Sequence, residues 1–206
     1  GLVTPTYPSI NQFNTVMAYV VLKDKAYVLD ATDKVTNVKL VPEKVVNTNG
    51  FIPEGENGRW KDVLSGKSKY KVMAAIQGEI DEAGNMKGNG LVNCYDYARA
   101  QRVKEWTQDN MKFKNDYFVT YYPGLKIEDI TINNVEADSL PLEQKVKFST
   151  VLNSSGEYRY FNINLFSDLE KNPFIAGTRV SDVDFGVHQE YTIFGNYTIP
   201  VGFTFD

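Results

Sequence analysis

Short runs of valine, isoleucine, threonine, tyrosine and phenylalanine recur along most of this chain. Its 206 residues include 13 tyrosines and 12 phenylalanines, which are spread among the β-branched residues and not gathered in one segment. Such side chains pack well on the pleated, half-buried surface of a sheet, and they lose rotamer freedom in a helix. The sequence therefore predicts a fold that is α+β and dominantly β.

Composition and charge limit the classes of protein to which the chain can belong. The residues are 42% hydrophobic and 23% charged, and a chain of this length buries roughly 70% of its unfolded surface, enough for one large or two small cores. The formal net charge of -4 gives no general attraction to phosphate backbones, so we expect no nucleic acid partner. No apolar run reaches the roughly 18 residues of a membrane span, and we expect none.

Two hairpins are predicted in the first half of the chain. Residues 15–22 and 26–30 are apolar runs that flank a three-residue polar break, Lys23-Asp24-Lys25. Residues 69–95 contain two alternating runs on either side of DEAGN, at positions 81–85. Alternation interrupted by a short turn-forming segment is typical of antiparallel strands joined in a hairpin.

The remaining segments predict a long connection, two helices and several strands. Residues 35–66 mix proline, glycine and asparagine without a period, so we expect an irregular connection with one short strand near Val45. Three- and four-residue spacing predicts a helix over about 95–110, and a second helical segment over about 112–121 ends before Pro123. Further strands are predicted at 126–133, 143–152, 157–166 and 189–205.

The first hairpin is built like the support of a nucleophilic site. A cysteine nucleophile needs a neighbouring base, and the base needs a third group that holds its tautomer. Asp30 ends the second apolar run, where it is well placed for that third role. The ordinary alternative is a turn aspartate that accepts hydrogen bonds from the backbone of residues 31–33.

Two stretches resemble a known family. SINQFNTVMAYVVLKDKAYVLDATDK (9–34) resembles the end of the catalytic core in transglutaminase-like proteins of Gram-negative bacteria, where Phe-Asn-His-Val, a hairpin and Leu-Asp-Ala-Thr follow one another. KNPFIAGTRVSDVDFGVHQEYTIFGNYTIPVGFTFD (171–206) is similar to the β-rich domain that follows such cores. The resemblance implies three parts: the last hairpin of a truncated core (1–34), an irregular connection (35–66) and an antiparallel β-sandwich-type module with one or two short helices (67–206).

The resemblance also implies which residues would form a vestigial catalytic site. The family's histidine falls on Thr15 and its orienting aspartate on Asp30, while its cysteine would lie upstream of residue 1. A hydroxyl has no usable basicity near neutral pH, and loss of a triad base costs on the order of 10⁶ in turnover. Cys94 follows the hairpin, and we expect it to be a small buried hydrophobe.

These implications favour a non-catalytic C-terminal fragment of a transglutaminase-like protein in the periplasm or cell envelope of a Gram-negative bacterium. The fragment would be structural or would present substrate, and its partner would be the upstream catalytic core. One alternative is part of an active cysteine-dependent transglutaminase or peptidase whose nucleophile lies upstream. Another is a module that binds carbohydrate or protein, with a peptide or glycan as ligand. An exposed hairpin edge could also pair with a second copy in a homodimer.

No cofactor and no metal site is predicted. Glu79, Asp81 and Glu82 cluster at a turn that attracts carboxylates for their solvation alone. Asp182, Asp184 and Glu190 could bind a metal, but they lack histidine partners. The single histidine, His188, stands at the start of a predicted strand, where we expect a structural role.

Exposed aromatic rings are the remaining candidates for binding a sugar or a peptide. Tyr117, Phe118, Tyr121 and Tyr122 gather in the second helical segment, and Tyr158 and Tyr160 share one face of a strand, opposite Phe161. Core packing is expected to account for most of these rings. Any patch that stays exposed would mark an interaction surface.

Overall fold

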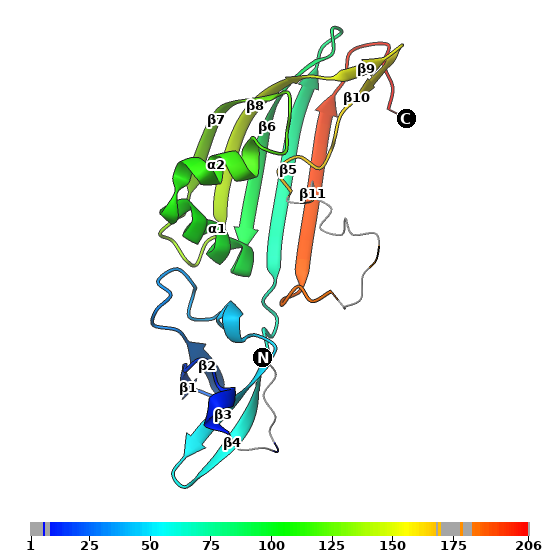
Figure 1. Ribbon diagram of the computed structural model, residues 1–206. Coiled ribbons are helices and arrows are strands. Elements are labelled where there is room, and N and C mark those ends of the chain that lie inside the picture. The colour runs from blue at the N-terminus through cyan, green and yellow to red at the C-terminus, as the bar shows by residue number, and fades with distance from the viewer. Residues whose placement is uncertain (1–5, 7–8, 168, 170–177, 179–182, 206) are drawn as a thin grey trace.

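The computed structural model describes residues 6, 9–167, 169, 178 and 183–205, and the elements given below belong to this part of the chain. The fold is α+β and dominantly β, as the sequence predicts. Two hairpins lie at one end of the molecule, and a five-stranded sheet with two helices on one face forms the other end (Figure 1).

The first predicted hairpin is confirmed, with shorter strands. Strands β1 (Ala18–Leu22) and β2 (Lys25–Leu29) pair antiparallel, with Ala18 opposite Leu29. Lys23 and Asp24 form the turn with φ of 48° and 65°, the left-handed conformation that suits the twist of a two-residue hairpin. A short 3-10 helix, η1 (Ile10–Gln12), precedes β1. Thr15 therefore lies in the segment that leads into the hairpin.

Residues 35–66 are less irregular than the sequence predicts. Strands β3 (Thr48–Glu54) and β4 (Asn57–Val63) form a further hairpin, and Val45 belongs to the 3-10 helix η2 (Glu43–Val45) and not to a strand. Pro53, which argues against a strand in the middle of a sheet, is tolerated here because both strands of a two-stranded sheet are edges. The cross-strand pair of Phe51 and Trp60 stabilises the hairpin.

The second predicted hairpin is confirmed and forms the centre of the large sheet. Strands β5 (Tyr70–Ile80) and β6 (Asn85–Tyr95) are joined by a turn in which the Asp81 carboxylate accepts a hydrogen bond from the backbone N–H of Asn85. Strands β7 (Leu125–Asn133) and β8 (Leu142–Val151) continue the sheet, and β11 (Gln189–Thr198) pairs parallel with β5. The order is β11-β5-β6-β8-β7, with all other pairs antiparallel.

The last two predicted strands are shorter than expected. Residues 157–166 contribute only β10 (Tyr158–Tyr160), which pairs with β9 (Asn153–Ser155) in a small hairpin. Strand β11 ends at Thr198 and does not continue to residue 205. Pro200 explains this end, because proline has no N–H for the ladder.

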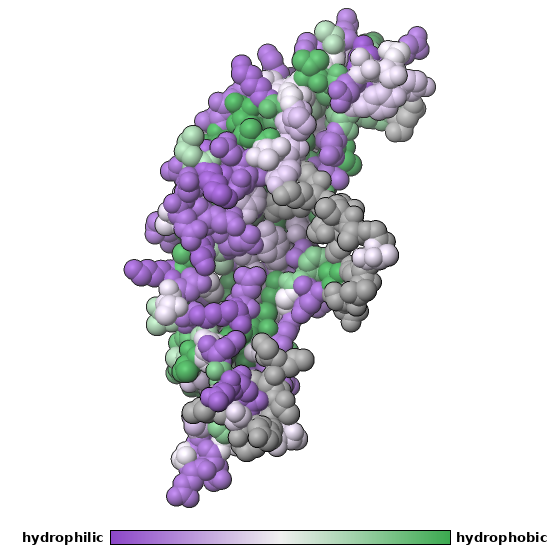
Figure 2. All heavy atoms as spheres, viewed as in Figure 1, coloured by the Kyte–Doolittle hydropathy of each residue, from purple (hydrophilic) through white to green (hydrophobic). Residues whose placement is uncertain are grey.

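Helices α1 (Asp96–Gln108) and α2 (Asn110–Phe118) form the second layer of the module, over one face of the large sheet (Figure 1). The Asp109 side chain begins α2 by accepting a hydrogen bond from the Lys112 N–H at 2.9 Å. Phe113 and Phe118 bury their rings against the sheet, where they join Val146 and Phe148 in the main core. The outer surface of the helices is hydrophilic (Figure 2).

Alternation along the strands assigns their side chains to two faces. In β5 the even-numbered Val72, Ala74 and Ile76 are buried beneath the helices, while Ala75 and Gln77 are exposed. Strands β6 and β8 follow the same pattern. One face of the sheet thus carries the core, and neither of the described helices covers the opposite face.

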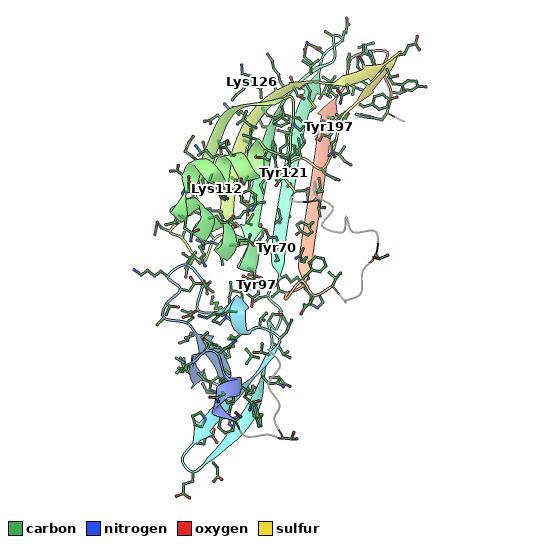
Figure 3. The ribbon with its side chains drawn as sticks, viewed as in Figure 1. Tyr70, Tyr97, Lys112, Tyr121, Lys126 and Tyr197 are labelled. Carbon is green, nitrogen blue, oxygen red and sulfur yellow. The ribbon has the colours of Figure 1, made fainter. Side chains whose placement is uncertain are left out.

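A small hydrophobic cluster joins the segment between β2 and β3 to the start of α1 and the segment before β11. Tyr97, at the start of α1, packs with Leu40, Val46 and Val187, and its hydroxyl donates to the Val41 carbonyl at 2.9 Å. Tyr97 lies between the sheet end and the hairpin end of the molecule (Figure 3). Burial raises the pKa of Tyr97 to about 12. Neither described helix is long and apolar enough to cross a membrane.

Candidate functional site

A large groove lies between the β1–β2 hairpin and the β3–β4 hairpin. These hairpins form the end of the molecule opposite the five-stranded sheet (Figure 1). The volume of the groove is about 1070 Å³, at the upper limit of small-ligand pockets. The segment before β1, both strands of each hairpin and the region of η2 supply its walls. The lining is mainly apolar, with Met17, Val28, Val45, Ile52 and Val63 among its residues.

Three aromatic rings form one wall of the groove. Phe13 stacks on Trp60 with centroids 5.9 Å apart, and Phe51 meets Trp60 edge-on at 5.3 Å. The ring of Phe51 lies across Gly58, where an added Cβ would approach the ring to 2.1 Å. A side chain at position 58 would therefore displace the Phe51 ring from its present place in the wall. The three rings follow no periodic pattern in the sequence, and the only local signal is that Phe51 and Trp60 each stand four residues from the Gly55-Glu56 turn.

Thr15 lines this groove and is exposed to solvent. It precedes the first paired residue of β1, Ala18, by three positions. Continuing the β1–β2 register would set Met17 opposite Asp30 and Thr15 diagonally on the same face. The position at which the family resemblance expects histidine thus borders this groove.

Asp30 is held in a turn by its own neighbours. Its Oδ1 accepts hydrogen bonds from the Thr32 N–H at 3.0 Å and the Thr32 hydroxyl at 2.6 Å, and its Oδ2 lies 2.6 Å from the Lys44 ammonium. Lys44 and Thr32 lower the pKa of Asp30 to about 2. These contacts match the ordinary alternative of a turn aspartate. Within the described residues, no hydrogen bond joins Asp30 to Thr15.

The remaining candidates for nucleophile and base do not approach the groove. Cys94 is fully buried in β6 beneath the helices, as expected, and its sulfur accepts a hydrogen bond from Gln144. His188 has an exposed side chain, and its backbone carbonyl accepts from the Tyr70 N–H at 2.8 Å. Neither residue is among those that line the groove.

The acidic clusters form no metal site in the part of the chain that the structure describes. Glu190 accepts from the Lys69 and Lys71 ammonium groups at 2.5 Å each, and these two lysines lower its pKa to about 2. Asp182, which the sequence analysis grouped with Asp184 and Glu190, lies outside the described residues. The Asp81 carboxylate accepts hydrogen bonds from the backbone N–H and the side-chain amide of Asn85 in the turn between β5 and β6.

Core packing accounts for several of the aromatic residues noted in the sequence. Phe118 and Tyr122 are buried, whereas Tyr121 is 36% exposed. Tyr158 and Tyr160 share a face, as predicted, with their exposed rings 6.3 Å apart. Phe161 instead packs against Tyr197 with centroids 4.7 Å apart.

Comparisons with family models, with curated proteins and with solved structures found no match to this chain.

Proposed function

We propose that this chain is the non-catalytic, substrate-presenting C-terminal part of a transglutaminase-like envelope protein, and that its groove holds an extended polypeptide segment. The observation that carries the proposal is the aromatic, apolar groove beside Thr15. None of the described residues that line it is a histidine or a cysteine. The assignment to an envelope protein and the partnership with an upstream core rest on the sequence resemblance.

The groove suits a polypeptide chain because two small sheets border it. Each hairpin has only two strands, so each strand leaves one row of backbone N–H and C=O groups unpaired by the ladder. An extended segment can pair with such an edge while its alternate side chains enter apolar pockets. The rings of Phe13, Phe51 and Trp60 supply large, rigid contact surfaces for those side chains.

The groups that line the groove favour binding of a peptide over cysteine-dependent catalysis. Thr15 offers a hydroxyl where proton transfer would need an imidazole. Lys44, which also lines the groove, is paired with the Asp30 carboxylate at 2.6 Å. The groove can therefore position a peptide, and no imidazole stands among its described lining residues to activate a thiol.

The test uses Trp60 as a reporter. The chain has two tryptophans, so Trp106→Phe leaves Trp60 as the single indole. A blocked ten-residue peptide that alternates leucine with glutamine and serine is titrated into this variant. We expect saturable quenching or enhancement of Trp60 emission, and mass spectrometry should show an unchanged peptide.

The matched variants are Phe51→Ala and Phe194→Ala, which remove rings that are 42% and 58% exposed. Phe51→Ala should weaken peptide binding by about tenfold or more, as expected for a central aromatic contact. Phe194→Ala, on the large sheet, should leave it unchanged. An absence of saturable binding, or conversion of the peptide's glutamine amides, would refute the proposed function.

A further inference from the structure

The face of the five-stranded sheet that no described helix covers carries a second, polar hollow. Its volume is about 380 Å³, and side chains from all five strands surround it. Exposed polar groups dominate its rim: Gln77, Glu79, Lys87, Asn89, Lys147 and Asn196. The hollow lies on the large sheet and is separate from the groove between the hairpins.

Strand register sets four of these side chains in one row across the sheet. Asn196 of β11 is opposite Gln77 of β5, Gln77 is opposite Asn89 of β6, and Asn89 is opposite Lys147 of β8. Directly opposite residues on one face have Cβ atoms roughly 5 Å apart. Three amides and one ammonium group thus stand side by side on neighbouring strands.

The side chains of this row form no hydrogen bond or ion pair with any described residue. In the next row, Glu79 is opposite Lys87, and these two charges also form no ion pair. At the other end of this face the charged groups are paired, because Lys69 and Lys71 both form ion pairs with Glu190. The hollow therefore leaves its donors and acceptors available to a ligand.

The chemistry of the rim selects the class of ligand. Two lysines and two glutamates, including Glu128, give the lining no net charge, so it favours neither an anion nor a cation. Amide side chains both donate and accept hydrogen bonds. This combination suits an uncharged molecule that is rich in hydroxyl groups.

An exposed aromatic ring lies beside the hollow. Phe194 is 58% exposed and precedes Asn196 by two residues, so both side chains stand on the same face of β11. Its cross-strand neighbour is the small Ala75, which leaves one side of the ring open. A phenyl ring of this kind offers the apolar C–H face of a pyranose a surface on which to stack.

We propose that this hollow, together with Phe194, binds a short uncharged oligosaccharide. The amide row supplies hydrogen bonds to sugar hydroxyls, and Phe194 supplies the stacking surface. This site does not depend on the peptide groove, and each could fail without the other.

The experiment is calorimetric titration of the full chain with cellohexaose, mannohexaose, chitohexaose and maltohexaose, and with hexagalacturonate as the acidic counterpart. We expect at least one neutral hexasaccharide to bind more tightly than hexagalacturonate. Phe194→Ala should weaken that binding at least tenfold, and the double variant Gln77→Ala/Asn89→Ala should weaken it by a similar factor. All three positions are exposed, so these variants should keep their fold.

The control is Tyr158→Ala, which removes a ring of matched exposure, 60%, from the small hairpin. Binding should be unchanged in this variant. The proposal is overturned if no neutral hexasaccharide binds, if the acidic one binds most tightly, or if Tyr158→Ala abolishes binding while Phe194→Ala does not.

Discussion

Asp30 stands where a catalytic pattern expects an orienting aspartate, but its carboxylate stabilises a turn. Its two oxygens are occupied by Thr32 and Lys44, and its side chain is only 10% exposed. An orienting aspartate must instead hold an imidazole. The contacts that Asp30 makes therefore stabilise the end of β2 and tie it to η2.

Titration of Asp30 tests this interpretation. The lowered pKa, about 2 against an ordinary 3.8, means that the ionised carboxylate stabilises the fold above pH 3.8. That stabilisation is lost as the pH falls through about 2. Carbon-13 NMR of the Asp30 carboxyl group should show a midpoint near 2, and Lys44→Met should move it toward 3.8. An ordinary midpoint in the unaltered chain would contradict the contacts with Lys44 and Thr32.

The buried environment of Arg102 predicts a large loss of stability when this side chain is removed. Its side chain is fully buried, donates to Gln144 at 2.8 Å and lies 4.0 Å from the centroid of the Tyr117 ring. Arg102→Ala leaves a cavity and takes the hydrogen-bond donor from a buried amide, so it should lower the free energy of unfolding by about 3 kcal/mol. Urea denaturation measures this change. Arg59→Ala, at an exposed ion pair with Glu54, should change it little.

At the scale of elements, the packing of β5 against β6 depends on a glycine pair. Gly78 is opposite Gly88, and a Cβ at position 88 would approach the Gln77 carbonyl oxygen to 2.5 Å and the Phe148 ring to 2.6 Å. Backbone cannot move aside as the end of a flexible side chain can. The close fit of Phe148 beneath the sheet thus requires glycine at this point.

Gly88→Ala should therefore lower the free energy of unfolding by roughly 2 kcal/mol, the usual cost of overpacking. Thermal and urea unfolding of the variant measure the effect. The matched control is Gly50→Ala in β3, where the nearest atom to an added Cβ is an ordinary 3.5 Å away. Equal stability of the two variants would show that the β5–β6 packing is looser than described.

The sequence predicts those elements whose pattern is local. Alternation in residues 69–95 and the spacing in 95–110 lead directly to β5, β6 and α1. The sequence does not predict the hairpin of β3 and β4, because Pro53 and several glycines resemble a loop. The strands nevertheless pair along their whole length, and the rings of Phe51 and Trp60 meet across the pair. Long-range contacts of this kind outweigh local propensity.

The candidate site could be predicted only in part for the same reason. The sequence predicts Thr15 and Asp30 on one hairpin, and the structure confirms the hairpin but places Thr15 before β1 and Asp30 directly after β2. The groove itself joins residues 9–17 to residues 48–64, and no local pattern shows that these segments meet. The amide row on the large sheet likewise depends on strand order, which places β11 beside β5 across more than 100 residues.

For the whole molecule, Tyr97 links the hairpin end to the module. Tyr97→Ala removes a buried ring from the cluster with Leu40, Val46 and Val187, together with the hydrogen bond to Val41. Local opening of the connection should become easier, while the main core remains closed. Hydrogen exchange should therefore speed up at least tenfold in residues 40–46 and stay unchanged in β6 and β8. Uniform acceleration throughout the sheet would show that the two ends unfold as one unit.

The proposed function can be tested most directly by mapping where the peptide contacts the chain. Backbone amide NMR shifts are recorded while the blocked leucine, glutamine and serine peptide is added to the unaltered protein. We predict that the shifts concentrate in residues 12–17, 48–53 and 60–64, which line the groove, and that the peptide is recovered with its mass unchanged. Shifts confined to the large sheet, or a peptide whose glutamines have been deamidated, would contradict a non-catalytic peptide groove between the hairpins.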